Sequence, residues 1–135
     1  MAEKEQSRTH RTLLSGLVIV VATALFTVLR PLVVSGDGVG YIKRLVSPER
    51  DIVPGHLVYV PLLESLRRTL FPDGGHADSA MLATFFSSLA GGIACGLLFW
   101  LTARLSKRIW AGLFAAVGLF ISYGFYRASG DVEAY

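Results

Sequence analysis

Residues 79–103 read SAMLATFFSSLAGGIACGLLFWLTA, an unbroken run without one charged side chain. A helix needs about 20 mostly apolar residues to cross the hydrocarbon core of a bilayer. This run therefore predicts a membrane-spanning helix. Asp78 stands immediately before it as a candidate N-cap, and Trp100 lies toward the far end, where interfacial indoles are common.

Gly92 and Gly96 form a G-x-x-x-G motif inside this run. Small residues at that spacing let a second helix approach closely, so the motif is a candidate packing face for a partner helix. The alternative is that small residues are simply frequent in membrane helices. The sequence leaves both interpretations open.

On the C-terminal side, residues 104–108 (RLSKR) form a basic turn without acids, and a third charge-free run covers residues 109–126. Two apolar runs joined by a short basic turn are typical of a helical hairpin whose turn is cytoplasmic. Residues 127–135 then begin a second outer loop that contains Asp131 and Glu133.

On the N-terminal side, residues 1–11 are polar and of mixed charge, which predicts a disordered cytosolic tail. Residues 12–34 follow as a first membrane helix, uncharged from Leu13 to Leu29. The alternative is a cleaved signal peptide, whose apolar region is normally about 7–15 residues long. This run is longer, which favours a retained anchor.

Residues 35–78 are the one long polar region, and their charges nearly cancel. Within them, residues about 57–71 place apolar side chains at helical spacing and Glu64, Arg67 and Arg68 on the other face. The segment is too short and too charged to cross a bilayer. It predicts an amphipathic helix in the membrane interface.

The composition agrees with a membrane protein: 53% of the residues are hydrophobic and only 17% are charged, against about a quarter in a typical soluble domain. The expected fold is all-α, with three transmembrane helices and one interfacial helix, in a bacterial-type inner (plasma) membrane. A cytoplasmic N-terminus and turn put residues 35–78 and the C-terminal segment outside. Cys95 is the single cysteine, which excludes an internal disulfide. No segment of the sequence combines basic and aromatic residues in the pattern that is typical of nucleic-acid-binding proteins.

Residues 34–41 (VSGDGVGY) gather three glycines around Asp37 just after the first membrane helix. A carboxylate at a low-dielectric surface can act as a base toward a hydroxyl or as a metal ligand. The alternative is an ordinary solvated loop, since loops are rich in Gly and Asp. His56, in the following Pro-Gly-His segment, has no partner at a recognised metal spacing and is a loop candidate only.

The order of these features resembles the start of GT-C class integral-membrane glycosyltransferases, and is similar to bacterial relatives of protein O-mannosyltransferases. Residues 35–41 stand where that family has an outer-loop acidic motif, with Val39 and Gly40 where the family has its Glu. Residues 53–59 (VPGHLVY) match its later Pro-Gly/His segment, and residues 89–108 match its hairpin. Residues 127–135 resemble its second acidic segment.

The resemblance implies sugar transfer from a polyprenyl-phosphate donor to an acceptor on the outer face, with this chain as the N-terminal part of the enzyme. Asp37 would be the base or site-organising carboxylate, and Asp131 or Glu133 a second acid that could act through a divalent metal. The candidates for contact with the donor phosphate are basic: Arg67, Arg68 and Arg127.

Two other functions remain open from the sequence. The chain could be a small non-enzymatic membrane subunit that packs against a partner through Gly92 and Gly96. A transport subunit is disfavoured because no charged residue lies inside the apolar runs 13–29, 79–103 and 109–126 of the predicted spans.

Overall fold

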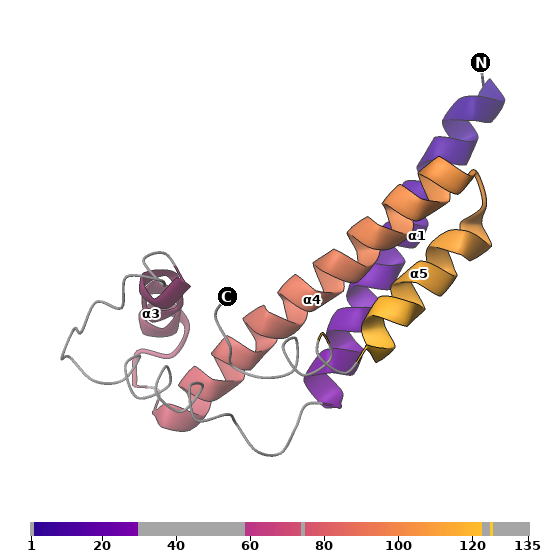
Figure 1. Cartoon of the computed structure of the whole chain (residues 1–135). Helices are drawn as coiled ribbons and strands as arrows, with labels where there is room; N and C mark the ends of the chain where they lie inside the picture. The colour runs from indigo at the N-terminus through magenta and orange to yellow at the C-terminus, as the bar shows by residue number, and fades with distance from the viewer. Residues whose placement is uncertain (1, 30–58, 74, 123–124, 126–135) are drawn as a thin grey trace.

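The computed structural model describes residues 2–29, 59–73, 75–122 and 125, and these residues form helices and turns without a strand. The helices are α1 (Ala2–Val28), α3 (Tyr59–Leu70), α4 (His76–Ser106) and α5 (Ile109–Ile121). In Figure 1, α1, α4 and α5 lie side by side as a bundle in which α5 runs back along α4. The expectation of an all-helical chain is confirmed for the described residues.

Two of the helices are long and apolar enough to cross a membrane, at Thr9–Val28 within α1 and Ala77–Ser106 within α4. The third apolar helix, α5, has 13 residues. At about 1.5 Å per residue it is roughly 20 Å long, shorter than the ~30 Å hydrocarbon core. Of the remainder of the third predicted run, residues 123–124 and 126 lie outside the described part of the chain.

The first helix begins earlier than the sequence pattern predicts. Residues 1–11 were expected to be disordered, but α1 is already helical at Ala2. Glu, Lys, Gln and Arg are good helix formers, so the polar tail can extend a helix that the apolar run has already nucleated. α1 ends at Val28, followed by a bend at Leu29, and residues 30–34 of the predicted span lie outside the described residues.

The start of α4 corrects the predicted cap. Gly75, not Asp78, is the N-cap residue, and Asp78 occupies the third helical position. From there its Oδ2 accepts a hydrogen bond from the backbone N–H of Gly75 at 3.0 Å. The carboxylate therefore satisfies an N–H at the helix start and lies where the helix dipole favours a negative charge.

At its other end, α4 runs through most of the predicted 104–108 turn and stops at Ser106. Lys107 takes a left-handed conformation with φ 58°, and Arg108 is extended. Ser106 Oγ donates to the carbonyl oxygen of Thr102 at 2.7 Å and accepts from the Arg108 N–H at 3.2 Å. This hydroxyl ties the end of α4 to the start of α5.

α4 is the central helix, because α1, α3 and α5 each pack against it. One core cluster joins Phe26 of α1 and Cys95 of α4 to Phe120 of α5 and to Phe125 beyond its end. A second cluster joins Phe99 and Ala103 of α4 to Ala116 of α5. The bundle is therefore held mainly along α4, and α1 and α5 meet directly at the first cluster.

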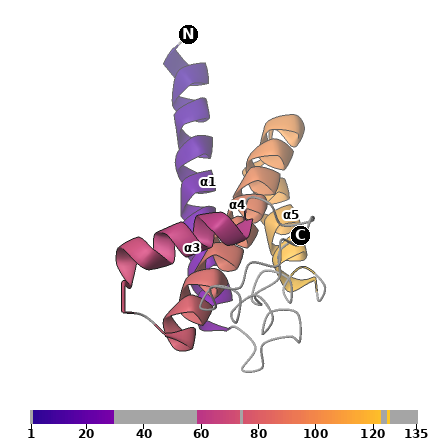
Figure 2. The same ribbon diagram turned by 90° about the vertical axis from the view of Figure 1, so that its left-hand side faces the viewer.

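α3 lies across the bundle axis beside α4, as Figures 1 and 2 show from perpendicular directions. It matches the helix predicted at about 57–71, with Pro61 in its first turn, where proline is tolerated. Its connection to α4 is short, from Leu70 to His76. α3 is thereby fixed near the end of the bundle at which α1 ends and α4 begins.

Candidate functional site

The tightest contact in the bundle lies where Gly92 and Gly96 of α4 meet α1. A Cβ atom on Gly92 would come within 2.1 Å of Thr23 Oγ1 and 2.8 Å of the Ile19 carbonyl oxygen. A Cβ atom on Gly96 would come within 2.2 Å of Ile19 Cγ1. Real Cβ contacts are not this short, so only glycine permits the approach.

The G-x-x-x-G motif is therefore used within the chain. The helix that lies on Gly92 and Gly96 is α1, rather than the helix of a partner protein. A subunit docking onto this chain would have to use a different face.

A hydrogen bond supports this close contact. Ser15 Oγ donates to the carbonyl oxygen of Gly96 at 2.8 Å, and Ser15 is buried. The Gly96 carbonyl is accessible to a side chain of α1 because neither glycine has a side chain to keep the backbones apart. The interaction links positions that are 81 residues apart in the chain.

Gly112 of α5 has the same role on the other flank of α4. A Cβ atom there would lie 2.6 Å from the Phe99 carbonyl oxygen and 2.9 Å from Ala103 Cβ. Gly16 and Gly118, by contrast, have nothing within 4 Å of the corresponding position. Helix packing therefore requires glycine at positions 92, 96 and 112 but not at positions 16 and 118.

Hydroxyl groups are concentrated in the buried interfaces. The buried polar side chains are all serines and threonines: Ser15, Thr23, Ser79, Thr84, Ser87 and Ser88. Thr84 and Ser79 donate to the carbonyl oxygen one turn earlier in their own helix region. Thr23 Oγ1 and Ser88 Oγ are buried without a hydrogen-bond partner among the described residues.

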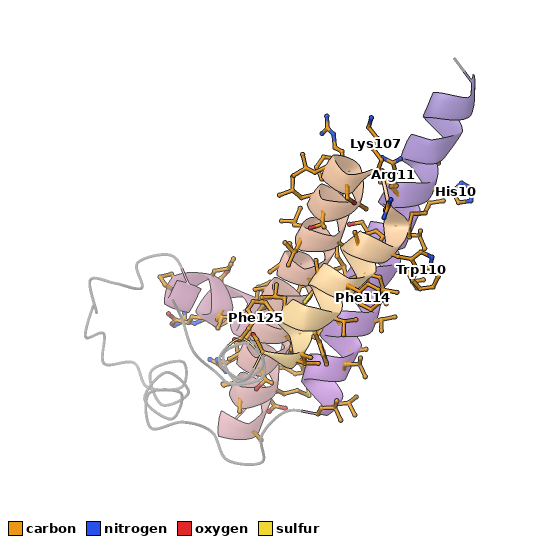
Figure 3. All side chains as sticks on the ribbon, turned by 45° about the vertical axis from the view of Figure 1, so that its right-hand side comes forward. His10, Arg11, Lys107, Trp110, Phe114 and Phe125 are labelled. Atoms are coloured by element: carbon orange, nitrogen blue, oxygen red, sulfur yellow. The ribbon has the colours of Figure 1, made fainter. Side chains whose placement is uncertain are left out.

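The surface of the bundle has the opposite composition. Large apolar side chains are exposed on all three long helices, among them Leu13 and Val28 on α1, Leu97 on α4 and Phe114 on α5. Figure 3 shows Phe114 and Trp110 pointing away from the bundle. Buried serines and threonines beside core residues such as Phe26 and Phe99, together with large apolar side chains on the surface, are compatible with an apolar solvent around the bundle.

The charged residues of α3 form the only part of the predicted catalytic site that the described residues include. Leu63 is buried at 1% exposure, and Arg67, one turn later, is half-buried. Arg68 is exposed and donates from Nη2 to Glu64 Oε1, the pairing expected at four residues' separation. An exposed ion pair of this kind contributes little to stability, so Arg68 can exchange Glu64 for another anion at small cost.

The other predicted site residues lie outside the described part of the chain: Asp37, His56, Arg127, Asp131 and Glu133. Within the described residues, no three His, Cys, Asp or Glu side chains come close enough together to hold a metal ion.

Ser15, Ile19 and Thr23 hold α1 to α4, and no sequence motif had indicated a role for them. Ser15 and Thr23 lie about two helical turns apart with no other polar side chain between them, and this spacing could have indicated which face of the first helix packs.

Comparison of the chain with known protein families, with curated proteins and with solved structures finds no match in any of the three.

Proposed function

We propose that this chain is an integral membrane protein, and that it forms the N-terminal part of a glycosyltransferase using a polyprenyl-phosphate sugar donor. The membrane assignment draws support from the exposed apolar surface. Leu13 is 67% exposed, Val28 77% and Phe114 75%, which water would penalise and lipid would not. α1 and α4 cross the bilayer, and α5 completes the hairpin.

The proposed orientation follows from the charges at the two ends of the bundle. Arg11 and Lys107 lie at one end (Figure 3), where residues 1–11 and 104–108 together hold six Lys and Arg against two acids, Glu3 and Glu5. This end is the cytoplasmic one by the positive-inside rule. The other end, with α3 and Asp78, then faces the outer side and carries charges of both signs.

One observation carries the enzymatic proposal: α3 places Arg67 and Arg68 near the end of the bundle where α1 ends and the segment with Asp37 follows. A donor with a polyprenyl tail and a phosphate head requires apolar surface next to cations at a membrane boundary. The exposed aliphatic side chains of the bundle would accept the tail. Arg68, which is exposed and pairs with the half-buried Glu64, would meet the phosphate.

The role proposed for Asp37 is that of a base toward the acceptor hydroxyl. This role rests on the resemblance of residues 35–41 to the acidic motif of the glycosyltransferases. Asp131, Glu133 and Arg127 are proposed from the same resemblance. The resemblance also implies a divalent metal beside Asp131 or Glu133, and this part of the proposed site lies outside the described residues.

The experiment is a transfer assay in membranes that contain the protein, with radiolabelled polyprenyl-phosphate hexoses as donors. Asp37→Asn should abolish transfer while leaving the amount of protein in the membrane unchanged. Asp73→Asn is the matched control, because it removes an exposed carboxylate from the turn between α3 and α4. Unchanged transfer by Asp37→Asn would remove Asp37 from the site. The double variant Arg67→Gln/Arg68→Gln should raise the KM for the donor more than it lowers kcat.

A further inference from the structure

The cytoplasmic end of the bundle carries a second charged surface that the glycosyltransferase proposal does not use. Arg104, Lys107 and Arg108 are exposed around the turn between α4 and α5. Arg11 of α1 lies at the same end (Figure 3). Leu14, one turn after Arg11, packs against the cluster that contains Ala103, so Arg11 is held near the level of the turn.

Local structure holds these cations in place. Ser106 joins Thr102 to Arg108 through its hydroxyl, and Lys107 adopts the one left-handed backbone conformation among non-glycine residues of the described chain. The Arg104 guanidinium carbon lies 5.1 Å from the centre of the Trp100 ring. A cation held over an indole loses less conformational freedom when it binds an anion than a cation on a free side chain.

Apolar side chains adjoin the cations. Leu105 is 74% exposed and Trp110 is 71% exposed, and Ile109 at the start of α5 is also exposed. A free phosphate ion needs only the cations. A surface that joins cations to exposed aliphatic and indole groups within two helical turns matches an amphiphile with an anionic head and an acyl chain.

The length of α4 puts this surface at headgroup level. Its 31 residues extend about 46 Å at ~1.5 Å per residue, against a hydrocarbon core of ~30 Å. α4 therefore projects beyond the hydrocarbon, and its basic end meets the lipid phosphates. Tryptophan is typical of the same layer.

We propose that the turn between α4 and α5 is a binding surface for anionic phospholipid, in which Arg104, Lys107 and Arg108 contact the headgroup phosphate and Trp110 and Leu105 contact the acyl chain. This inference rests on the membrane part of the proposed function and not on the glycosyltransferase part. Selective binding there would hold the hairpin in one orientation and depth in the inner leaflet.

The protein contains its own probe. Its two tryptophans, Trp100 and Trp110, flank the basic turn. The purified full chain is reconstituted into phosphatidylcholine vesicles that contain increasing fractions of brominated phosphatidylglycerol or, in parallel, brominated phosphatidylcholine. Vesicle flotation first establishes that the protein is inserted. Bromine quenches a nearby indole, so quenching reports which lipid occupies the surface.

Brominated phosphatidylglycerol should quench more strongly than brominated phosphatidylcholine at equal mole fraction. Lys107→Gln/Arg108→Gln should lower this preference by roughly fivefold for each cation removed. That variant leaves Arg104 over Trp100 and so keeps this neighbour of the Trp100 indole. Lys43→Gln/Arg44→Gln, which removes two adjacent cations from the sequence between α1 and α3, is the matched control and should keep the preference.

Three results would overturn the inference. Equal quenching by the two lipids in floated vesicles would refute anionic selectivity while leaving the membrane proposal intact. Displacement of phosphatidylglycerol by inorganic phosphate at constant ionic strength would assign the surface to a free anion. Failure of the protein to float with vesicles would refute both the surface and the proposed membrane function.

Discussion

Ser15 Oγ and the carbonyl oxygen of Gly96 are 2.8 Å apart, and this buried hydrogen bond joins the first third of the chain to the last third. It forms where the side chain of Ile19 occupies the space that a Cβ atom on Gly96 would need. The hydrogen bond from Ser15 is directional, and the contact between Ile19 and Gly96 leaves no room for a methyl group. Together they fix the register of α1 on α4.

Alanine substitution of the interface glycines should therefore destabilise the bundle. A Cβ atom on Gly92 would overlap Thr23 Oγ1 at 2.1 Å and approach the backbone of Ile19, which cannot move without shifting α1. Gly92→Ala and Gly96→Ala should each lower the free energy of unfolding by about 1–3 kcal/mol. Unfolding in mixed detergent micelles, followed by circular dichroism, measures the change.

The same substitution elsewhere in the bundle is the control. Gly16→Ala and Gly118→Ala add a Cβ atom where nothing lies within 4 Å. Since glycine in a helix interior costs about 0.5–1 kcal/mol relative to alanine, these variants should be as stable as the wild type or more so. Equal effects at all four positions would show that α1 does not pack on α4 through these glycines.

Removing the Ser15 hydroxyl should weaken the same interface. We expect Ser15→Ala to lower the free energy of unfolding by about 0.6–1.7 kcal/mol, from the average to the maximum measured for hydrogen bonds between helices in a membrane protein. Thr27→Val is the matched control. The Thr27 hydroxyl donates at 2.8 Å to the backbone carbonyl oxygen of Thr23, so this hydrogen bond lies within α1 and does not join two helices. If the two variants lose equal stability, the Ser15 bond does not hold the helices together.

Removing the two buried hydroxyls that lack a partner among the described residues should not lower the free energy of unfolding. Thr23 is 8% exposed and Ser88 is fully buried, and neither hydroxyl has a partner among the described residues. Thr23→Val keeps the shape of the side chain and removes a polar group that has lost its water, so it should be neutral or stabilising. Ser88→Ala should behave likewise. In the same micelle assay, a loss as large as that of Ser15→Ala would contradict this assignment.

The sequence was sufficient to predict the two long apolar helices, whereas the third predicted span, residues 109–126, corresponds to a helix that ends at Ile121. Charge-free runs predict helices of membrane length, and the structure has α4 over the whole of the run at 79–103. Helix ends were less predictable because they depend on single interactions. The N-cap of α4 is Gly75 rather than Asp78, since the Asp78 carboxylate can reach back to the Gly75 N–H from inside the helix.

Helix pairing was beyond the sequence. Both α1 and α5 have apolar surfaces that could cover Gly92 and Gly96, and the motif alone does not say which of them, or which partner, does so. The choice depends on Ser15, Ile19 and Thr23 presenting one complementary face along α1. Of the predicted catalytic site, only Arg67 and Arg68 lie within the described residues, so the role of Asp37 remains a prediction.

The aromatic cluster between α1 and α5 offers a test of the third helix. Phe26 is fully buried, and its ring centre lies 4.6 Å from that of Phe120 and 5.9 Å from that of Phe125. Phe26→Ala would leave a cavity among these rings, and we expect a loss of about 3 kcal/mol or more in the free energy of unfolding. Phe114→Ala, which removes an outward-facing ring of the same size, is the control and should be nearly neutral. If both variants lose the same free energy of unfolding, Phe26 does not pack against Phe120 and α5 does not lie beside α1.

The proposed orientation predicts that the two ends of α4 lie on opposite sides of the membrane. Asp73, in the turn before α4, and Ser106, at its end, are both exposed, so cysteine at either position is accessible from its own side. Asp73→Cys should react with a membrane-impermeant maleimide on intact cells. Ser106→Cys should react only after permeabilisation. The wild type supplies the background, because its one cysteine, Cys95, is 1% exposed.

Each possible labelling pattern has a distinct meaning. If Ser106→Cys but not Asp73→Cys reacts on intact cells, the bundle has the opposite orientation to the proposed one. Both α3 and the Asp37 segment would then be cytoplasmic, away from an acceptor on the outer face. Reaction of both on intact cells would mean that α4 does not cross the bilayer. Since the exposed faces of Leu97 and Leu101 would then meet water, that result would also remove the physical reason for the bundle's apolar surface.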